Sequence, residues 1–146
     1  MTARYVVDTS VVVQNLITDV CTPAVELLFT QAGDGVIELW VPDFCLIECA
    51  NVLWKAARFR GLPPEQAAQL LLDLVSFPLY ITPVAELLPR ALALGLAHDL
   101  AVYDCIFIAM AERLTCPLIT VDERQSEVAV AGGIPLKKVS EFMAGA

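Results

Sequence analysis

Hydrophobic runs and amphipathic stretches alternate along this chain. Residues 4–7, RYVV, form a continuous segment that ends in β-branched apolar residues, which is typical of a buried strand. The same reasoning predicts further strands at 36–41, 79–81, 117–121 and 134–139. Capping residues and helical periodicity predict helices from about Ser10, over 23–30, 44–60, 64–76, 83–94 and 102–114, and from Asp122 to the Gly132-Gly133 pair.

Glycine and proline mark the ends of several of these elements. Gly61 and Gly95 are each expected to stop the helix that precedes them. Pro78 indicates an edge position in the sheet for the strand that follows it. The alternation of strands and helices predicts an α/β fold with a mostly parallel sheet and helices on both faces. Residues 1–146 contain no repeat or linker, so a single domain is expected.

Four acidic residues stand in apolar surroundings, where an unpaired carboxylate is costly to bury. Asp8 directly follows the first predicted strand, and Asp122 follows LITV by the same pattern. Glu48 lies inside the apolar segment FCLIECANVLW, and Asp104 lies in the first turn of VYDCIFIAMAE. Because the sites of parallel sheets lie beyond the carboxyl ends of the strands, Asp8 and Asp122 are expected at one edge.

The functional interpretation of these acids is a site for a hard divalent cation. Oxygen ligands favour Mg²⁺ or Mn²⁺, whereas zinc favours Cys and His, which this chain does not arrange in a motif. Such ions clamp phosphates and lower the pKa of a bound water. The alternatives are local: Asp8 caps the next helix, Asp104 serves its own helix start, and Asp122 begins a turn. Glu48 has no capping role in mid-helix, which favours one acidic cluster.

Charge and composition limit the partners. Nine Lys and Arg face seventeen Asp and Glu, for a formal net charge of −8. Nucleic-acid binding is therefore disfavoured unless a metal neutralises several carboxylates. Hydrophobic residues make up 58% of the chain, but no run approaches the roughly 18 apolar residues of a membrane-spanning helix. The surplus is expected to cover an oligomer interface. No signal peptide is recognised, and a cytoplasmic location with no membrane partner is expected.

The five cysteines are expected to be buried and reduced, because their number is odd and no CxxC motif occurs. Cys45 and Cys49 are four residues apart and could share a helix face as a metal pair, but no partner motif accompanies them. The single histidine, His98, is interpreted as a polar loop residue beside Asp99.

Three segments together resemble the PIN domain, and within it the VapC-type toxins of toxin–antitoxin pairs. They are VVDTSVVV, PDFCLIECANVLW and AVYDCIFIAMAERLTCPLITVDER, in that order and over nearly the whole chain. The resemblance implies a three-layer α/β/α sandwich and a metal-dependent endoribonuclease. The resemblance also implies that the catalytic and metal-binding acids of the family correspond to Asp8, Glu48, Asp104 and Asp122. It further implies a homodimer and a small VapB-type antitoxin as partners.

Three polar residues match the family's pattern around these acids. Ser10 matches a small hydroxyl after the first acid, Asn51 a helix asparagine one turn after Glu48, and Thr120 a hydroxyl before the last acid. The resemblance suggests that they orient the acids or a water. The alternatives are a helix N-cap for Ser10, an exposed polar residue for Asn51 and an ordinary strand residue for Thr120.

Basic residues are scarce near the acids. Lys55, Arg58 and Arg60, two to three turns beyond Glu48, are the local candidates for contacting RNA. The alternative is that they complement the dipole at the end of their helix. Their small number is a departure from what an RNA-gripping toxin would show.

The function predicted from these observations is hydrolysis of RNA phosphodiesters with one or two Mg²⁺ or Mn²⁺ ions. One alternative is a PIN nuclease without an antitoxin, and another is a non-catalytic PIN-like interaction module. A third alternative makes Asp8 the nucleophile of a phosphotransferase or the phosphoacceptor of a receiver-like domain. The phosphotransferase pattern requires a second Asp where Ser10 stands, and a receiver requires a paired acidic segment that is absent beside Asp8.

Overall fold

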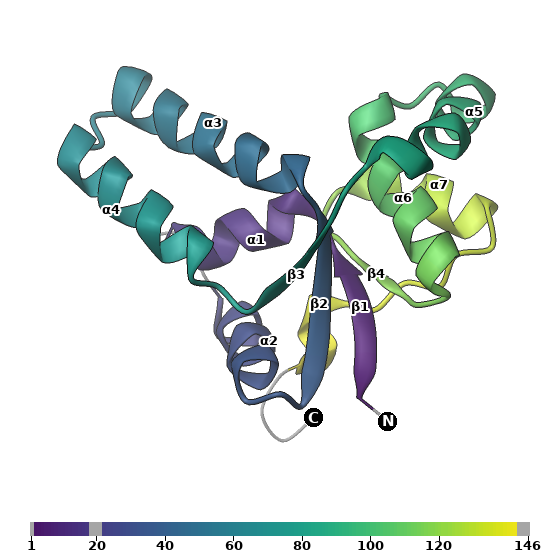
Figure 1. Cartoon of the computed structure of the whole chain (residues 1–146), viewed down its shortest axis with the longest axis horizontal. Coiled ribbons are helices and arrows are strands. Elements are labelled where there is room, and N and C mark those ends of the chain that lie inside the picture. The colour runs from purple at the N-terminus through teal and green to yellow at the C-terminus, as the bar shows by residue number, and fades with distance from the viewer. Residues whose placement is uncertain (1, 18–21, 143–146) are drawn as a thin grey trace.

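Four strands and seven α-helices make up the part of the chain that this computed structural model describes, residues 2–17 and 22–142 (Figure 1). The strands are β1 (Ala3–Val7), β2 (Ile37–Pro42), β3 (Leu79–Thr82) and β4 (Leu118–Ile119). The α-helices are α1 (Thr9–Leu16), α2 (Pro23–Gly33), α3 (Phe44–Phe59), α4 (Pro64–Val75), α5 (Leu88–His98), α6 (Val102–Leu114) and α7 (Glu123–Ala131). Two 3₁₀ turns, η2 (Ala85–Leu87) and η3 (Val139–Phe142), complete the described elements.

The four strands form one parallel sheet in the order β3-β2-β1-β4. The first strand is central: Tyr5 of β1 is level with Leu39 of β2, and Val7 of β1 is level with Ile119 of β4. β3 lies at an edge, as Pro78 predicts. The expectation of a parallel sheet is confirmed, and the carboxyl ends of β1 and β4 therefore lie side by side.

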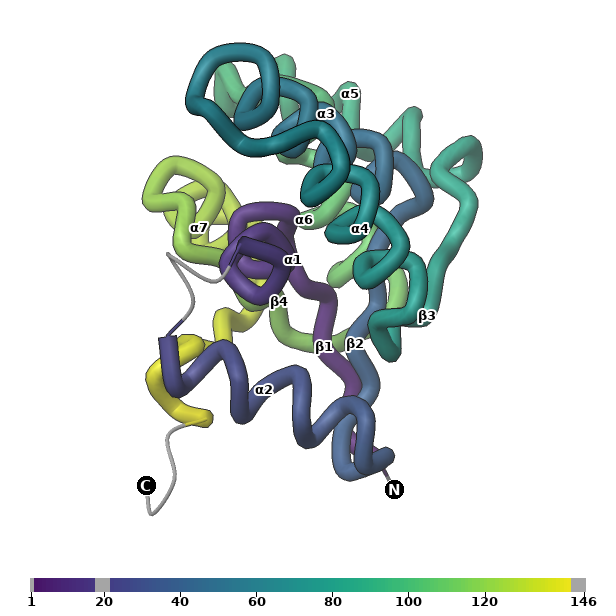
Figure 2. The backbone as a smooth tube through the Cα atoms, turned by 90° about the vertical axis from the view of Figure 1, so that its left-hand side faces the viewer, coloured from purple at the N-terminus to yellow at the C-terminus, as the bar shows by residue number. Residues whose placement is uncertain are grey.

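Helices cover both faces of this sheet. Figure 1 shows α1, α2, α3 and α4 on one side of the strands and α5, α6 and α7 on the other. Figure 2 shows α3 and α5 at one end of the molecule and α2 at the opposite end. The three-layer α/β/α sandwich implied by the resemblance is thus confirmed.

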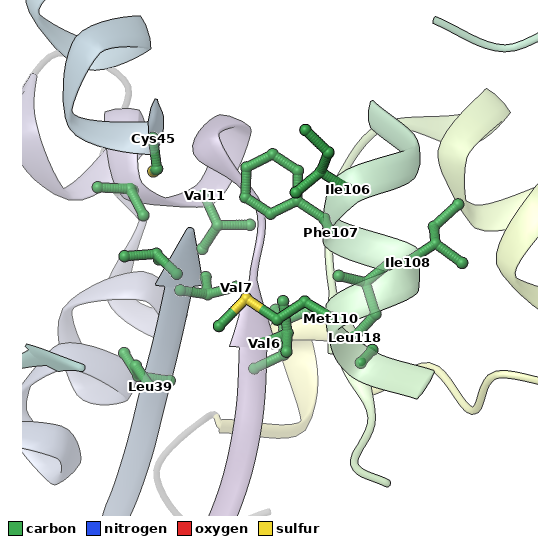
Figure 3. Close-up of a cluster of buried hydrophobic side chains, with 14 of the residues drawn as sticks. Val6, Val7, Val11, Leu39, Cys45, Ile106, Phe107, Ile108, Met110 and Leu118 are labelled. Carbon is green, nitrogen blue, oxygen red and sulfur yellow. The ribbon is translucent and has the colours of Figure 1, made fainter. Parts of the chain in front are cut away.

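A continuous apolar core joins the sheet to α6 (Figure 3). Val6 and Val7 of β1 are fully buried, and Phe107 and Met110 of α6 are each 1% exposed. All of positions 105–111 in α6 are buried, so this helix has no polar stripe in its middle. Burial of each large apolar side chain contributes about 1.5–3 kcal/mol relative to exposure. The core therefore holds rigidly the strand from which Asp8 projects.

The helix predicted over 83–94 both begins and ends later than expected. A 3₁₀ turn precedes α5, which continues to His98, so the prediction that Gly95 ends the helix is wrong. Gly95 is buried inside the helix, where a Cβ would lie 2.7 Å from the carbonyl oxygen of Leu100. The helix instead ends at Asp99, whose φ of 54° is left-handed. Gly95 is therefore required by a close backbone approach.

The last two strand predictions are too long. Only Leu118 and Ile119 of the segment 117–121 pair in the sheet. The segment 134–139 is not a strand: it contributes a single parallel bridge, and η3 begins at its last residue. Pro135 lacks an N–H and cannot donate to a ladder at this point.

The cysteine expectation is confirmed for four of the five residues. Cys45, Cys49, Cys105 and Cys116 are free and buried, and Cys21 lies outside the described residues. Burial raises the pKa of Cys105 and Cys116, and the neighbouring Cys45 raises that of Cys49. In residues 2–17 and 22–142 no single helix is long and apolar enough to cross a membrane; only the bent pair 85–98 and 102–114 reaches that length and composition.

Candidate active site

Asp8 and Asp122 lie at the same edge of the sheet, as predicted. Asp8 follows β1, and its backbone N–H donates to the carbonyl of Ile119 in β4 at 2.9 Å. Thr120 bridges the two acids: its Oγ1 donates to Oδ2 of Asp8 at 3.3 Å and accepts from the backbone N–H of Asp122 at 3.0 Å. The expectation for this pair is thereby confirmed.

Both aspartates also cap helices. Asp8 is the N-cap of α1 and accepts from the backbone N–H of Ser10 at 3.1 Å, so α1 begins at Thr9 rather than near Ser10. Asp122 is the N-cap of α7 and accepts from the backbone N–H of Gln125 at 2.8 Å. The local and the functional interpretations are therefore compatible, because one carboxylate provides the capping oxygen and still faces the sheet edge.

Glu48 enters the cluster from the middle of α3. Burial raises the pKa of its carboxyl group above the ordinary 4.5, a hydrogen bond from Thr9 lowers it, and the charges of Asp8 and Asp104 raise it further. The hydroxyl of Thr9 donates to Oε1 of Glu48 at 2.6 Å. Glu48 is therefore a half-buried acid that interacts electrostatically with two other acids, and not an isolated surface charge.

Asp104 enters from the first turn of α6, as predicted. Burial raises the pKa of its carboxyl group above the ordinary 3.8, and the charges of Asp8 and Asp122 add to this rise. The charge of Asp8 thus raises the pKa of both Glu48 and Asp104, and the charge of Asp122 raises the pKa of Asp104. The four predicted acids form one electrostatic cluster with Asp8 at its buried end.

Exposure increases across this cluster. Asp8 is 6% exposed, Glu48 and Asp104 are half-buried, and Asp122 is exposed. The cluster therefore opens to solvent at Asp122, where a large substrate can approach.

No basic side chain neutralises these acids in the part of the chain that the structure describes. The ion pairs there join Arg90 to Glu112, Arg113 to Glu86, Arg124 to Glu127 and Lys137 to Glu141. Asp8, Glu48, Asp104 and Asp122 take part in none of them. Like charges gathered without a counterion repel, and a cation would relieve this repulsion.

The donor chemistry of the cluster fits a hard divalent cation. Its carboxylate oxygens are the ligands that Mg²⁺ and Mn²⁺ favour. Within residues 2–17 and 22–142, however, no three His, Cys, Asp or Glu side chains already stand in an arrangement that could hold a metal ion. The residues therefore fit the cation in type and charge, whereas a ligating geometry is not preformed.

The three polar residues that were predicted to orient the acids or a water have different surroundings. Thr120 contacts Asp8, as described above, so it is not an ordinary strand residue. Ser10 is not the helix N-cap; its Oγ accepts from the backbone N–H of Val121 at 3.4 Å and so ties α1 to the segment after β4. Asn51 is exposed on α3, one turn after Glu48. Two of the three thus lie in the hydrogen-bond network of the sheet edge.

The three basic candidates are exposed and form no ion pair with the four acids. Lys55, Arg58 and Arg60 lie in the second half of α3 and just after it. The guanidinium of Arg58 lies over the ring of Phe59, 5.4 Å from its centroid. Arg60 lines a cavity of about 620 Å³ between α1, α3 and α4, which is separate from the acidic cluster.

Two residues of the network were missed from the sequence. Thr9 stands beside Asp8 in the sequence, and nothing local marks it as a hydrogen-bond partner of Glu48. Gln125 is fully buried in α7 and donates from Nε2 to Oδ1 of Asp8 at 3.2 Å and to the carbonyl of Asp104 at 3.0 Å. The D-x-x-Q pattern resembles a helix capping box, in which the glutamine would reach the backbone N–H of Asp122, so it gives no signal for the contacts that are observed.

Comparison with known proteins identifies the family. The chain matches the PIN domain over residues 5–131. This chain belongs to the PIN-domain family. The resemblance of the three sequence segments is thereby confirmed.

Relatives of this PIN-domain protein agree with the assignment. Ribonuclease VapC3 of Pyrobaculum aerophilum is 33% identical over 126 residues, which cover 85% of this chain and 93% of that protein. A crystallised protein of the same organism shares 18% identity at a TM-score of 0.71, covering 97% of this chain and 93% of its own. VapBC2 of Rickettsia felis, solved with a DNA fragment of its promoter, shares 15% identity at a TM-score of 0.69, covering 92% and 98%. The solved structures share the fold of this chain.

Proposed function

We propose that this PIN-domain protein is an endoribonuclease that depends on Mg²⁺ or Mn²⁺ and hydrolyses RNA phosphodiesters. The observation that carries the proposal is the cluster of four acids at the carboxyl edge of the sheet, without a basic partner in residues 2–17 and 22–142. The name of the VapC3 relative, a ribonuclease, supports RNA as the substrate. The proposed unit is one domain that spans residues 1–146.

The residues of the cluster and the polar residues around it have different proposed roles. Asp8, Asp104 and Asp122, with Glu48, would hold one or two cations. When bound, the cation supplies charge to stabilise the phosphate oxygens and lowers the pKa of a water. Thr120 and Ser10 hold the sheet-edge backbone, and Thr120 orients Asp8. Glu48 would hold the cation together with the aspartates, and the hydroxyl of Thr9 fixes its Oε1 by a hydrogen bond.

Lys55, Arg58 and Arg60 would contact the RNA backbone beyond the scissile bond. At 1.5 Å per helical residue, positions 55 and 60 lie roughly 10 and 18 Å along α3 from Glu48. This spacing matches phosphates a few nucleotides away from the cleaved one. Few basic residues imply modest affinity that falls with salt.

The decisive experiment measures cleavage of single-stranded and structured RNA with Mg²⁺ or Mn²⁺. Asp104→Asn and Asp8→Asn should each lower the rate by at least about 100-fold, since charge stabilisation at such sites is worth several kcal/mol. The matched control is Asp34→Asn, which removes an exposed acid at the end of α2. Cleavage that survives EDTA or Asp104→Asn would refute the proposal. No cleavage together with no divalent-cation binding would favour a non-catalytic interaction module instead.

We further propose that the protein works in the cytoplasm with a small VapB-type antitoxin. The Rickettsia felis VapBC2 assembly supports such a partner, and the buried free cysteines suit a reducing compartment. A short reading frame directly upstream that encodes a DNA-binding protein would be expected. If co-expression of that protein does not suppress RNA cleavage, a PIN nuclease without an antitoxin is the better description.

A homodimer is also part of the proposal. Leu88, Leu92 and Leu96 repeat at four-residue spacing, so they share one exposed face of α5. Sedimentation should give a dimer that Leu92→Glu converts to monomer, because a charge cannot be buried there without a partner. Val130→Glu, which places the same charge at an exposed apolar position of α7, is the control.

A further inference from the structure

Gln125 is a fully buried amide among carboxylates. It lies on α7, three residues after Asp122, and its Nε2 donates to two acceptors on different elements. One acceptor is Oδ1 of Asp8, at 3.2 Å, and the other is the backbone carbonyl of Asp104, at 3.0 Å. A single NH₂ group therefore joins α7 to the end of β1 and to the first turn of α6.

The orientation of this amide follows from its neighbours. Both contacts on the Nε2 side are acceptors, so a flipped amide would place Oε1 against a carboxylate oxygen and a carbonyl oxygen. Oε1 must therefore point the other way. There it is buried and accepts no hydrogen bond from the described residues.

Stability alone does not explain this choice of residue. A buried acceptor without a partner costs about 1–3 kcal/mol, whereas an apolar side chain of the same shape would avoid that cost. Nor does the side chain serve the helix start, because the backbone N–H of Asp122 already donates to Thr120. What the amide provides, and an apolar residue cannot, is a donor for Asp8.

The donor completes the restraint of Asp8. Oδ2 of that carboxylate accepts from the backbone of Ser10 and from Thr120, whereas Gln125 is the contact on Oδ1. With donors on both oxygens, the carboxylate plane cannot rotate. The same NH₂ group fixes the backbone of Asp104, so two acids of the cluster are held relative to one another.

We propose that Gln125 is a positioning residue of the acidic cluster, whose amide sets the orientation of Asp8 relative to Asp104 for cation binding. This inference rests on the proposed function. It assigns to α7 a side chain that orients the acids without touching RNA.

The first test compares Gln125→Met with the unchanged protein. Methionine keeps the length and removes both the donor and the unpartnered acceptor. The midpoint of thermal unfolding without metal should stay equal or rise, whereas Mn²⁺ affinity measured by calorimetry should fall about 10- to 100-fold. The kcat for RNA should fall by a similar factor with KM little changed. The control, Gln31→Met, lies near the end of α2, which Figure 2 shows at the opposite end from α3 and α5.

The outcomes separate the inference from the function on which it rests. If the unchanged protein binds no Mn²⁺ and cleaves no RNA, the proposed function falls and the role of Gln125 falls with it. If the unchanged protein binds Mn²⁺ and Gln125→Met binds it equally well, only the positioning role is overturned. Lower stability with unaltered Mn²⁺ affinity would likewise show a purely structural residue.

A measurement without substitution covers the case in which Gln125→Met does not fold. In ¹⁵N-labelled protein, saturation with diamagnetic Mg²⁺ should shift the side-chain amide resonances of Gln125 and leave those of Gln31 in place. If Mg²⁺ shifts the backbone amides of Asp8 and Asp104 but not the Gln125 side chain, the proposal is overturned.

Discussion

The hydroxyl of Thr9 donates a 2.6 Å hydrogen bond to Oε1 of Glu48, linking the first residue of α1 to the middle of α3. This bond lowers the pKa of a carboxyl group that burial and two neighbouring acids raise. The pKa of Glu48 is thus set by two opposing effects, the hydrogen bond from Thr9 and the burial among other acids. Its protonation depends on a side chain 39 positions away in sequence.

Removal of that hydroxyl should make Glu48 more basic. In Thr9→Val the carboxyl group loses its donor, so its pKa should rise, as a carboxyl ¹³C titration would measure. The kcat should fall about tenfold near neutral pH, because the carboxylate of Glu48 loses the donor that holds its Oε1 in place, and a hydrogen bond to a charged group is worth roughly 1.5 kcal/mol. Thr9→Ser keeps the donor and should titrate as the unchanged protein does. Equal pKa values in all three proteins would contradict the role of Thr9.

The metal-free protein should lose stability as pH rises above about 4. The folded-state pKa values of Glu48 and Asp104 lie above their ordinary values of 4.5 and 3.8. Between the unfolded and folded pKa values the folded state holds protons that the unfolded state has released, so the free energy of unfolding falls through this window. Denaturation in EDTA across pH 4–8 measures the slope. Mg²⁺ at 100 times its Kd should restore about 2.7 kcal/mol.

Asp104→Asn should remove activity and stabilise the metal-free fold at neutral pH. The substitution keeps the shape of the side chain and deletes a charge that Asp8 and Asp122 repel. Thermal unfolding in EDTA should therefore occur at a higher temperature in the variant than in the unchanged protein. The order should reverse in saturating Mg²⁺, because the variant binds the ion weakly. Asp34→Asn should show neither effect.

Gly95→Ala should destabilise the protein by roughly 1–3 kcal/mol, as overpacking in a well-packed interior does. Its Cβ would lie 2.7 Å from the carbonyl oxygen of Leu100. Gly33→Ala, at the end of α2, is the matched control, because its Cβ meets nothing within 4 Å. That change should be neutral or stabilising by about 0.4–1 kcal/mol. Urea denaturation of both variants tests the contrast.

Replacement of Lys55, Arg58 and Arg60 by alanine should weaken RNA binding without altering the cluster. Each lost phosphate contact with single-stranded RNA should lower the slope of log K against log salt by about 0.7. Binding is measured with the inactive Asp104→Asn background so that the RNA stays intact. Alanine at Arg113, which pairs with Glu86, is the control. An unchanged salt slope would indicate that other groups hold the RNA.

The sequence was sufficient wherever the signal was local. The bounds of α6 were predicted without error, since a long apolar run spans the whole helix. The parallel sheet followed from the alternation of strands and helices, and the shared edge of Asp8 and Asp122 followed from the repeated strand–acid pattern. Such features need only neighbours in the chain.

Two failures have different causes. Gly95 resembled a helix stop, but α5 continues to His98 and the chain then turns so that the carbonyl of Leu100 approaches Gly95. Gln125 resembled a polar surface residue in a helix start, but it faces Asp8 across 117 positions. The local pattern does not show the contacts of Gln125, because its partners are set by the tertiary fold.

The order of the strands along the chain determines when the residues of the site become available during synthesis. β1 emerges first and lies in the centre of the sheet, but its neighbour β4 is made after most of the chain. The hydrogen bonds around Asp8 can form only after the segments with Asp104, Asp122 and Gln125 have been made. A ribosome that has not yet made residue 125 therefore carries a chain with an incomplete cluster. The cluster can assemble only after α7 has left the exit tunnel.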